Sequence, residues 1–323
     1  MGIELGGILS FLTSFAIMAS IYAIFSMGLN VHWGYTGLLN FGIAGFFAIG
    51  AYTSALITTP RPTGVLADYV DQAIGLNQPF LVGVVGAAIA SGLLALLIGL
   101  LTLRLRAGYL AISTIGIAES IRLFFNNEAW LANGPEGLVG LPRPLHDLVP
   151  PRYYNFVYLA IVLAFLVLIY IALERGIRSP WGRVLRAMRE DEIMTSADGK
   201  DVFLFKLQSL VVGAMIMGIA GALFAHFQAA IQPGLFTPLF GTFIIWTMLT
   251  VGGTGNNKGA ILGAFVVWAL WSWSAFFILK LVPPGFETRA PFIRYILIGL
   301  VLVIVLLRRP RGIIGEERQV SRF

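Results

Sequence analysis

The three histidines are the first candidates for chemistry, and their spacing does not suit a metal site. His32, His146 and His226 lie far apart, and no His-Glu-x-x-His signature is present. The chain has no Cys, which excludes disulfides, thiolate nucleophiles and cysteine-ligated zinc or iron–sulfur centres. A Gly-x-Ser-x-Gly nucleophile elbow is also missing. We therefore predict no catalytic residues, no metal and no cofactor, and we expect His226 to be a polar residue inside the fold.

A glycine-rich stretch, Gly252–Gly259, superficially resembles a phosphate-binding loop. That motif requires glycine at the position of Asn257 and a hydroxyl side chain at the position of Gly259. The stretch therefore does not predict ATP binding, and any ATP that drives this protein must be bound by another chain. Its glycines favour irregular backbone and a tight turn between two short apolar segments.

The composition excludes a water-soluble protein of this size. Of the 323 residues, 58% are apolar and 12% are charged, and the mean hydropathy is +0.84. Soluble chains have roughly 25% charged residues, so this chain is expected to lie in a lipid membrane. The formal net charge of +6 is typical of basic cytoplasmic loops in membrane proteins, and it does not predict nucleic-acid binding.

Apolar runs of about 20 residues predict an all-α, polytopic bundle in one transmembrane domain, residues 1–323. The first run lacks a preceding basic region and is too long for a signal peptide, so we expect it to be retained. The seventh run is short and ends in glycines, so a broken or re-entrant helix near 239–258 would change the count from about nine to eight or ten. The predicted spans are 8–28, 37–58, 80–103, 107–125, 155–173, 206–230, 239–254, 259–280 and 291–307.

Basic residues predict the sidedness of the loops. Most Lys and Arg residues fall in three regions that the nine-span topology brings to one side. Loops rich in Lys and Arg remain in the cytoplasm. We therefore expect a cytoplasmic turn at 104–106, a cytoplasmic loop at 174–206 and a cytoplasmic tail at 308–323. The N-terminus and the loop 126–154 then lie outside.

Small residues recur at intervals that place them on one helical face. Such faces let helix backbones approach closely in a membrane. Two such faces and one glycine-rich segment are present: Ala214, Gly218 and Ala222; Gly83, Ala87 and Ser91; and Gly37, Gly42, Gly45 and Gly50. They predict a packed bundle with the second span in a crowded position.

Charged residues inside the predicted spans are scarce. Only Glu119 and Arg122 clearly fall within one, and their spacing of three predicts an intramembrane ion pair on one helical face. Carriers coupled to ions or protons usually have an acidic or histidine relay at mid-depth. The missing relay disfavours that class.

The loop 174–206 mixes charges of both signs with apolar residues. Ser179 and Pro180 supply the N-cap and first residue of a helix, and Gly199 can end a second short helix. This pattern predicts either an amphipathic helix at the membrane surface or a docking surface for a cytoplasmic partner.

Several blocks, in order along the chain, resemble the inner-membrane permeases of branched-chain amino acid ABC importers, of the LivM type. The resemblance covers roughly residues 20–315. Many of these permeases have Ser and His near the positions of Asn40 and Ile43, so the substrate preference can differ here. The blocks are Gly28–Gly37, Asn40–Gly42, Phe46–Thr53, Arg104–Ile112, Ala118–Arg122, Asn133–Leu138, Gly182–Lys206 and Gly252–Gly263.

The resemblance implies a transport subunit without a catalytic site, in the inner membrane of a bacterium. Its partners would be a homologous permease, two cytoplasmic ATPases and a periplasmic binding protein. Together they would import branched-chain or hydrophobic amino acids by alternating access; relatives of the same group carry urea, short amides or other amino acids. The helix near residues 190–200 would be the coupling helix. The residues expected to couple to the ATPases are Arg183, Arg186, Glu190, Asp191, Glu192, Gly199 and Lys200.

A translocation path needs polar groups that bind substrate weakly. The candidates are Asn30, Asn40, Thr53 and Thr114; hydrogen bonding between helices is the alternative role. The outer loop 126–154 contains five prolines, so we expect it to be stiff and non-helical. It could dock the binding protein or act as a structural lid. A self-sufficient channel or secondary carrier and a membrane enzyme are the competing classes.

Overall fold

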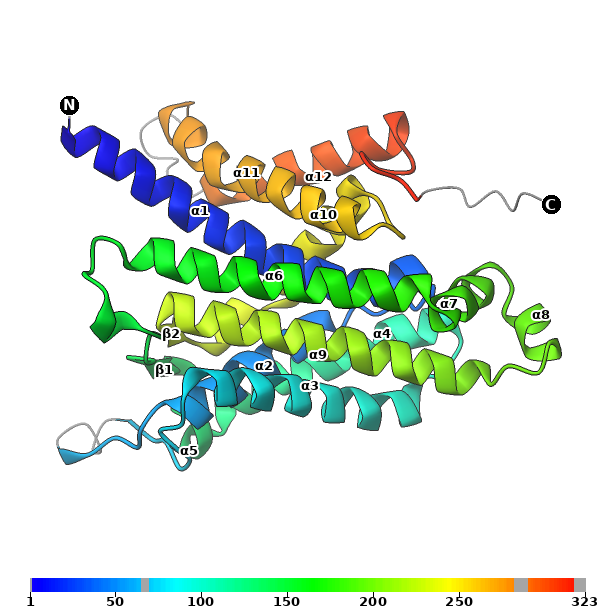
Figure 1. Cartoon of the computed structure of the whole chain (residues 1–323), viewed down its shortest axis with the longest axis horizontal. Helices are drawn as coiled ribbons and strands as arrows, with labels where there is room; N and C mark the ends of the chain where they lie inside the picture. Colours follow the sequence, from blue (N-terminus) through cyan, green and yellow to red (C-terminus); the bar gives the residue numbers. More distant parts are fainter. Residues whose placement is uncertain (1, 65–69, 282–289, 317–323) are drawn as a thin grey trace.

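The computed structural model describes residues 2–64, 70–281 and 290–316, and it is an elongated bundle of helices (Figure 1). Within the described part, five helices are long and apolar enough to cross a membrane. Each predicted span corresponds to a helix, which confirms the all-α polytopic fold. The helices that correspond to the predicted spans are α1 (Gly2–Leu29), α2 (Ile43–Thr58), α3 (Phe80–Thr102), α4 (Ala107–Asn127), α6 (Tyr154–Arg178), α9 (Val202–Gln228), α10 (Ile244–Gly252), α11 (Asn257–Leu281) and α12 (Ala290–Arg308).

Two of these helices, α2 and α10, are shorter than the others. A π-helix, η1 (Asn30–Tyr35), continues α1, and the chain is then non-helical until Ile43. The prediction of a span that begins at residue 37 is therefore wrong at its start. Gly37 has a φ of +75°, which breaks the helical path. A second π-helix, η6 (Leu239–Phe243), precedes α10, so the seventh predicted span is short and irregular where it begins.

The predicted small-residue faces pack against each other where α2, α3 and α9 meet. A Cβ atom on Gly218 of α9 would lie 2.3 Å from Ser91 Oγ and 2.6 Å from the Ala87 carbonyl oxygen of α3. A Cβ atom on Gly50 of α2 would lie 2.2 Å from the Gly218 carbonyl oxygen. Only glycine permits these approaches, and Ser91 Oγ also donates a hydrogen bond to the Phe46 carbonyl at 3.0 Å. These contacts hold the centre of the bundle together.

One end of the bundle is capped by loops. The strands β1 (Leu138–Val139) and β2 (Ala230–Ile231) pair antiparallel there. The prediction of a non-helical loop over 126–154 is wrong in part, because α4 extends to Asn127 and short helical turns follow: α5 (Ala129–Ala132), η3 (Gly134–Glu136) and η4 (His146–Leu148). Asn133, at φ +60°, ends α5 and donates to the Gly137 carbonyl at 3.1 Å.

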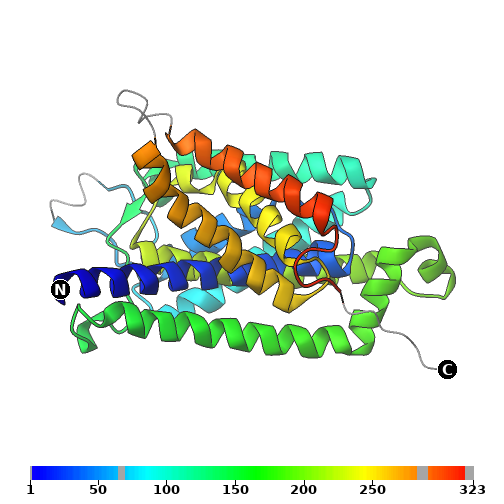
Figure 2. The same cartoon turned by 90° about the horizontal axis from the view of Figure 1, so that it is seen from above.

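The other end holds the two surface helices α7 (Pro180–Glu190) and α8 (Glu192–Ala197), opposite the N-terminus (Figures 1 and 2). Ser179 occupies the N-cap position of α7, but its hydroxyl donates to the Gly176 carbonyl instead of capping the helix. Gly199, at φ +74°, follows the end of α8. The three predicted basic regions meet at this end: Arg104 lies 5.7 Å from the centre of the Phe203 ring, and Arg189 pairs with Glu316 of the tail.

Candidate functional site

The break between η1 and α2 leaves backbone polar groups without helical partners inside the bundle. Side chains satisfy the amides: Phe41 N donates to Thr114 Oγ1 at 3.1 Å, and Gly42 N donates to Asn40 Oδ1 at 2.8 Å. Unsatisfied backbone is costly at membrane depth, so such a break persists only where protein or water supplies partners. Asn40 and Thr114, both predicted to line the path, thus lie together at the start of α2.

The carbonyl groups of the break are bonded from the opposite side, by α10 and the π-helix before it. Trp246 Nε1 donates to the Asn40 carbonyl at 3.2 Å, and Thr242 Oγ1 donates to the Phe41 carbonyl at 3.1 Å. A Cβ atom on Gly241 would lie 2.9 Å from Ala44 Cβ. The first turns of two short helices therefore adjoin within the bundle. Interrupted helices of this kind form substrate sites in many transporters.

His32 ties the break to α9. Its Nε2 lies 2.9 Å from the Leu210 carbonyl oxygen, and its Nδ1 lies 3.2 Å from Asn40 Nδ2. Because the Leu210 carbonyl can only accept, Nε2 of His32 must carry the proton. In the neutral ring Nδ1 is then unprotonated and accepts a hydrogen bond from the Asn40 side-chain amide. The imidazole is fully buried, and a Cβ atom on Gly213 would lie 2.3 Å from its Nε2. The sequence gives no sign of this role, because the residues that bond His32 are not in a recognisable motif with it.

The other two predicted path residues lie apart from the break. Asn30 is buried in η1, where Nδ2 donates to Asn257 Oδ1 at 3.1 Å and Oδ1 accepts from Gly255 N at 2.9 Å. It therefore joins η1 to the loop before α11. Thr53 lies on α2 facing α3, since its Cγ2 would be 3.8 Å from a Cβ atom on Gly86. The structure thus brings Asn40 and Thr114 together and separates Asn30 and Thr53 from them.

The exposed face of α4 is unusually polar for a membrane helix. Arg122 donates to Glu119 at 2.5 Å, and these side chains keep 22% and 36% of their surface exposed. Ser120 is exposed between them. The same helix also exposes Ile112, Leu123 and Phe124, and the exposed faces of α3 and α6 present large apolar side chains, among them Leu101 and Leu168. Charges facing lipid are costly, so on α4 the stretch around the Glu119–Arg122 pair is the part least suited to lipid.

Arg189 of α7 makes contacts that the sequence analysis missed. Its Nη1 donates to the Gly34 carbonyl of η1, and its Nη2 donates to Glu316 at 2.7 Å and to Glu190 at 2.9 Å. Burial of the guanidinium opposes its charge, but the hydrogen bonds to Glu316 and Glu190 outweigh burial and raise the pKa of Arg189 above its ordinary value. Helical spacing places Arg189 next to the buried face of α7, which Leu185 and Met188 define, but it does not indicate partners as distant as Gly34 and Glu316.

The predicted coupling residues divide into structural and exposed groups. Arg186 donates to the Ile177 carbonyl at 2.9 Å and so closes the end of α6. Asp191 Oδ1 accepts from the amides of Ile193 and Met194, both at 2.9 Å, and caps α8. Glu192 pairs with Lys206 at 2.6 Å. The side chains that remain exposed around α7 and α8 include Arg183, Glu190 and Lys200.

The α8 surface also exposes apolar side chains. Ile193 is 83% exposed and Met194 is 69% exposed, although α8 lies outside the membrane-spanning segments. Large apolar side chains grouped on a short, capped helix are typical of a surface that a partner protein covers.

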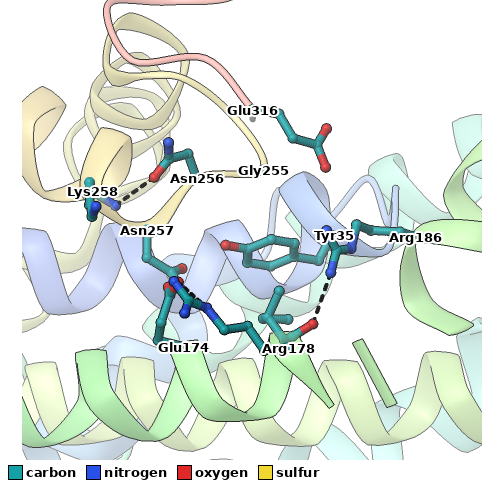
Figure 3. A pocket seen from close by; sticks show the side chains of 10 residues that line it. Tyr35, Glu174, Arg178, Arg186, Gly255, Asn256, Asn257, Lys258 and Glu316 are labelled. Carbon is teal, nitrogen blue, oxygen red and sulfur yellow. Dashed lines mark hydrogen bonds and ion pairs between the residues drawn. The ribbon is translucent and has the colours of Figure 1, made fainter. Parts of the chain in front are cut away.

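A polar pocket of about 380 Å³ lies between α6, α7, η1 and the loop before α11 (Figure 3). Glu174 and Arg178 come from α6, Asn257 and Lys258 from the start of α11, and Glu316 from the tail. Asn257 Nδ2 donates to Glu174 at 3.3 Å, and Arg178 pairs with Glu174 at 2.8 Å. Charges of both signs therefore line one pocket.

The glycine-rich stretch forms the irregular turn between α10 and α11. Gly253 has a φ of +123° and Gly255 a φ of +76°. The tail pairs with this turn, since Ile313 N donates to the Val251 carbonyl at 2.9 Å. His226 is buried, with Ser54 and the Pro142 carbonyl as hydrogen-bond partners. Within the described ranges, no group of His, Asp and Glu side chains is arranged to hold a metal ion.

Comparison with known proteins identifies the family of this fold. Residues 11–306 match the family model described as branched-chain amino acid transport system / permease component. The chain is 31% identical to the high-affinity permease protein LivM of Salmonella typhimurium, over 94% of this chain and 70% of the relative. It is 28% identical to the probable LivM of Methanocaldococcus jannaschii, over 92% of this chain and 91% of the relative.

A second group of relatives carries a different name. The permease protein LivH of Escherichia coli is 25% identical, over 93% of this chain and 92% of the relative. No solved structure matches the chain significantly. The matched family model spans the helices α1 to α12, including the break, the polar α4 face and the surface helices. The chain therefore belongs to the family of branched-chain amino acid transport permeases and is a multi-pass membrane protein.

Proposed function

We propose that this chain is one of two permease subunits of an ATP-driven importer of branched-chain or other hydrophobic amino acids. The observation that carries the proposal is a continuous link between a surface and the bundle. The exposed α8 adjoins α7, and Arg189 of α7 bonds to η1 next to the break before α2. A partner that moves α8 can thereby move the interrupted helix.

In this proposal α8 is the coupling helix and docks into a cytoplasmic ATPase. The exposed Ile193 and Met194 enter an apolar groove, and the surrounding charged side chains fix the orientation. ATP binding in the partner then rocks the helices between states open to each side. Basic residues at this end assign it to the cytoplasm by the positive-inside rule, so the N-terminus is outside.

The polar α4 face meets a homologous permease, and the translocation path lies between the two subunits. Asn40 and Thr114 flank the path at the break, Asn30 lies toward its cytoplasmic end, and Thr53 lies farther along α2. Amide and hydroxyl groups bind substrate weakly and so permit release. The exposed loops at the opposite end, within residues 126–154, receive a periplasmic binding protein.

Reconstitution tests this function. The purified chain is placed in liposomes alone, and in parallel with a partner permease, ATPases and a binding protein. We expect leucine uptake only when all of these components are present and ATP is on the side of the membrane that holds the ATPases. Uptake by the chain alone would identify a channel or secondary carrier instead. Urea or a short amide that competes fully with leucine would reassign the substrate.

A further inference from the structure

An apolar groove runs along the seam between α6 and α11, near the end that holds α7 and α8. Its volume is about 470 Å³, and almost all of its lining is apolar. The walls include Leu166 and Tyr170 of α6, Leu262 and Phe265 of α11, and Ile314 of the tail. The groove therefore opens on a part of the surface that the bilayer surrounds.

The groove continues into the polar pocket of Figure 3. Lys258, in the first turn of α11, lines both cavities. Along α6, Leu166 and Tyr170 line the groove, and Glu174 and Arg178, one and two turns farther on, line the pocket. The seam thus changes from apolar to charged in the direction in which a bilayer changes from acyl chains to headgroups.

The charges of the pocket are only partly used within the protein. Lys258 is exposed and makes no ion pair with any residue that the structure describes. Glu174 binds Arg178 and Asn257, and Glu316 binds Arg189. A carboxylate offers about four acceptor positions, so both acids can accept further hydrogen bonds.

We infer that this seam binds one phosphatidylethanolamine molecule of the adjacent leaflet. Its phosphate pairs with Lys258, its ammonium donates to the carboxylates of Glu174 and Glu316, and one acyl chain occupies the groove. The mixed charges select this headgroup. Arg178 and Arg186 also line the pocket, so the selection depends on the hydrogen bonds of the ammonium. Phosphatidylglycerol has no ammonium to donate to the two carboxylates, and the quaternary ammonium of phosphatidylcholine has no N–H to donate.

A second apolar surface, formed by side chains of α6 alone, suits the other acyl chain. It is lined by Ala160, Ala164 and Leu168, shares Val167 with the groove, and has Arg175 at its polar end. Its volume is about 810 Å³. Two apolar tracks that share Val167 and end at basic side chains match the two chains of one phospholipid.

The selectivity must come from the headgroup. An acyl chain that leaves the bilayer for the groove exchanges one apolar environment for another, so it gains little from the hydrophobic effect. The ion pair between phosphate and Lys258 and the hydrogen bonds of the ammonium distinguish the lipid instead. The site also lies against the tail and the turn before α11, next to Glu316, which binds Arg189 of α7.

Native mass spectrometry of the purified transporter complex tests the inference. The complex is titrated with equal amounts of phosphatidylethanolamine, phosphatidylglycerol and phosphatidylcholine. We expect preferential retention of phosphatidylethanolamine, reduced about fivefold by Lys258→Ala, as one lysine contributes near a membrane surface. Leu262→Trp should reduce it without changing any charge, because the indole fills the groove. Arg152→Ala, at the opposite end of α6, is the matched control and should change nothing.

Equal retention of the three lipids, or unchanged retention in Lys258→Ala, would show annular lipid only and overturn the inference. A preference for phosphatidylglycerol would overturn the assigned headgroup. Each variant must elute as the intact complex, which separates lost binding from misfolding. Lipid retention is measured without transport or ATP, so a complex that retains phosphatidylethanolamine but does not take up leucine would overturn the proposed function and leave this inference standing.

Discussion

At the scale of single residues, Arg189 hydrogen-bonds α7 to the interrupted part of the bundle, beside the packing of Leu185 and Met188 against Tyr35 of η1. It bonds the Gly34 carbonyl on one side and Glu316 on the other, and is partly buried. A rigid, planar guanidinium can hold both partners at once, and a lysine ammonium cannot reproduce that fork. The residue therefore suits transmission of movement more than docking.

We expect Arg189→Ala to uncouple ATP hydrolysis from transport. Loss of the hydrogen bond between Arg189 and η1 should reduce the rate of uptake roughly tenfold. This corresponds to a coupling free energy of about 1.4 kcal/mol. Basal ATPase activity should persist, since the α8 surface is unchanged. The measurement is uptake and ATPase rate in the same reconstituted complex. Arg152→Ala, exposed at the opposite end, is the control, and equal uptake by both variants would remove Arg189 from the coupling route.

Asn40 is the second residue whose loss should be measurable. Asn40→Ala leaves the Gly42 amide and His32 Nδ1 without their partner, which costs about 1–3 kcal/mol of stability for buried polar groups. The thermal melting temperature of the complex should fall, and relative uptake rates of leucine, valine and alanine should change if the side chain also contacts substrate. Asn127→Ala, at the exposed end of α4, should leave both unchanged.

Glu119 and Arg122 show what sequence spacing can predict at this scale. They stand three apart on one helix, and the pair forms. Arg189 and His32 were missed because their partners, Gly34 and Leu210, are more than 150 residues away. Local spacing says nothing about such pairs. Asn40 and Thr114 were recognisable as polar residues in apolar segments, but their shared position at the break depends on how the helices pack.

At the scale of elements, α8 presents a surface that a partner should cover. Burial of one isoleucine side chain contributes about 1.5–3 kcal/mol. We therefore expect Ile193→Ser to weaken ATPase binding at least tenfold, measured by co-purification and by titration of the ATPase onto the permease pair. Leu148→Ser, also strongly exposed but at the opposite end, is the control. Unchanged ATPase affinity in Ile193→Ser would contradict the docking role.

The α3–α9 contact gives a prediction about stability. A Cβ atom on Gly218 would clash with Ser91 and the Ala87 backbone, so Gly218→Val should destabilise the bundle by about 1–3 kcal/mol. Gly299→Ala of α12 meets nothing within 4 Å and should be neutral. The melting temperatures of both variants, measured in the same detergent, test this prediction. A neutral Gly218→Val would show that the helices can separate without cost.

The sequence predicted which segments are helices because each apolar run is long enough to span a bilayer. It failed where side chains replace the backbone bonds of a helix, as between Tyr35 and Ile43. There the partners of the backbone come from α4 and α10, far along the chain. The prediction of a non-helical outer loop was wrong in part for a related reason. Asn133 ends a helical turn that the prolines of this loop do not predict.

At the scale of the whole molecule, the distribution of polar surface predicts where a second permease binds. Exposed side chains on α3, α6 and α12 are mainly apolar, whereas α4 exposes Ser120 beside the Glu119–Arg122 pair. Within α4, Ser120 Oγ donates to the Gly116 carbonyl and Arg122 pairs with Glu119, but the charges of that pair are still costly beside lipid. We therefore expect the stretch of α4 around this pair to meet a protein or water neighbour.

Because the chain has no Cys, one introduced cysteine can carry a benzophenone photo-crosslinker at a defined position. We expect Ser120→Cys to crosslink to the partner permease in the assembled complex. Leu168→Cys, on the lipid-facing side of α6, should give no protein adduct and should react with lipid. If both positions crosslinked only to lipid, the α4 face would not be the subunit interface, and the path between subunits would have to lie on another face. If Leu168→Cys alone captured the partner, the lipid-facing assignment of α6 would fall as well, because the same surface cannot meet both.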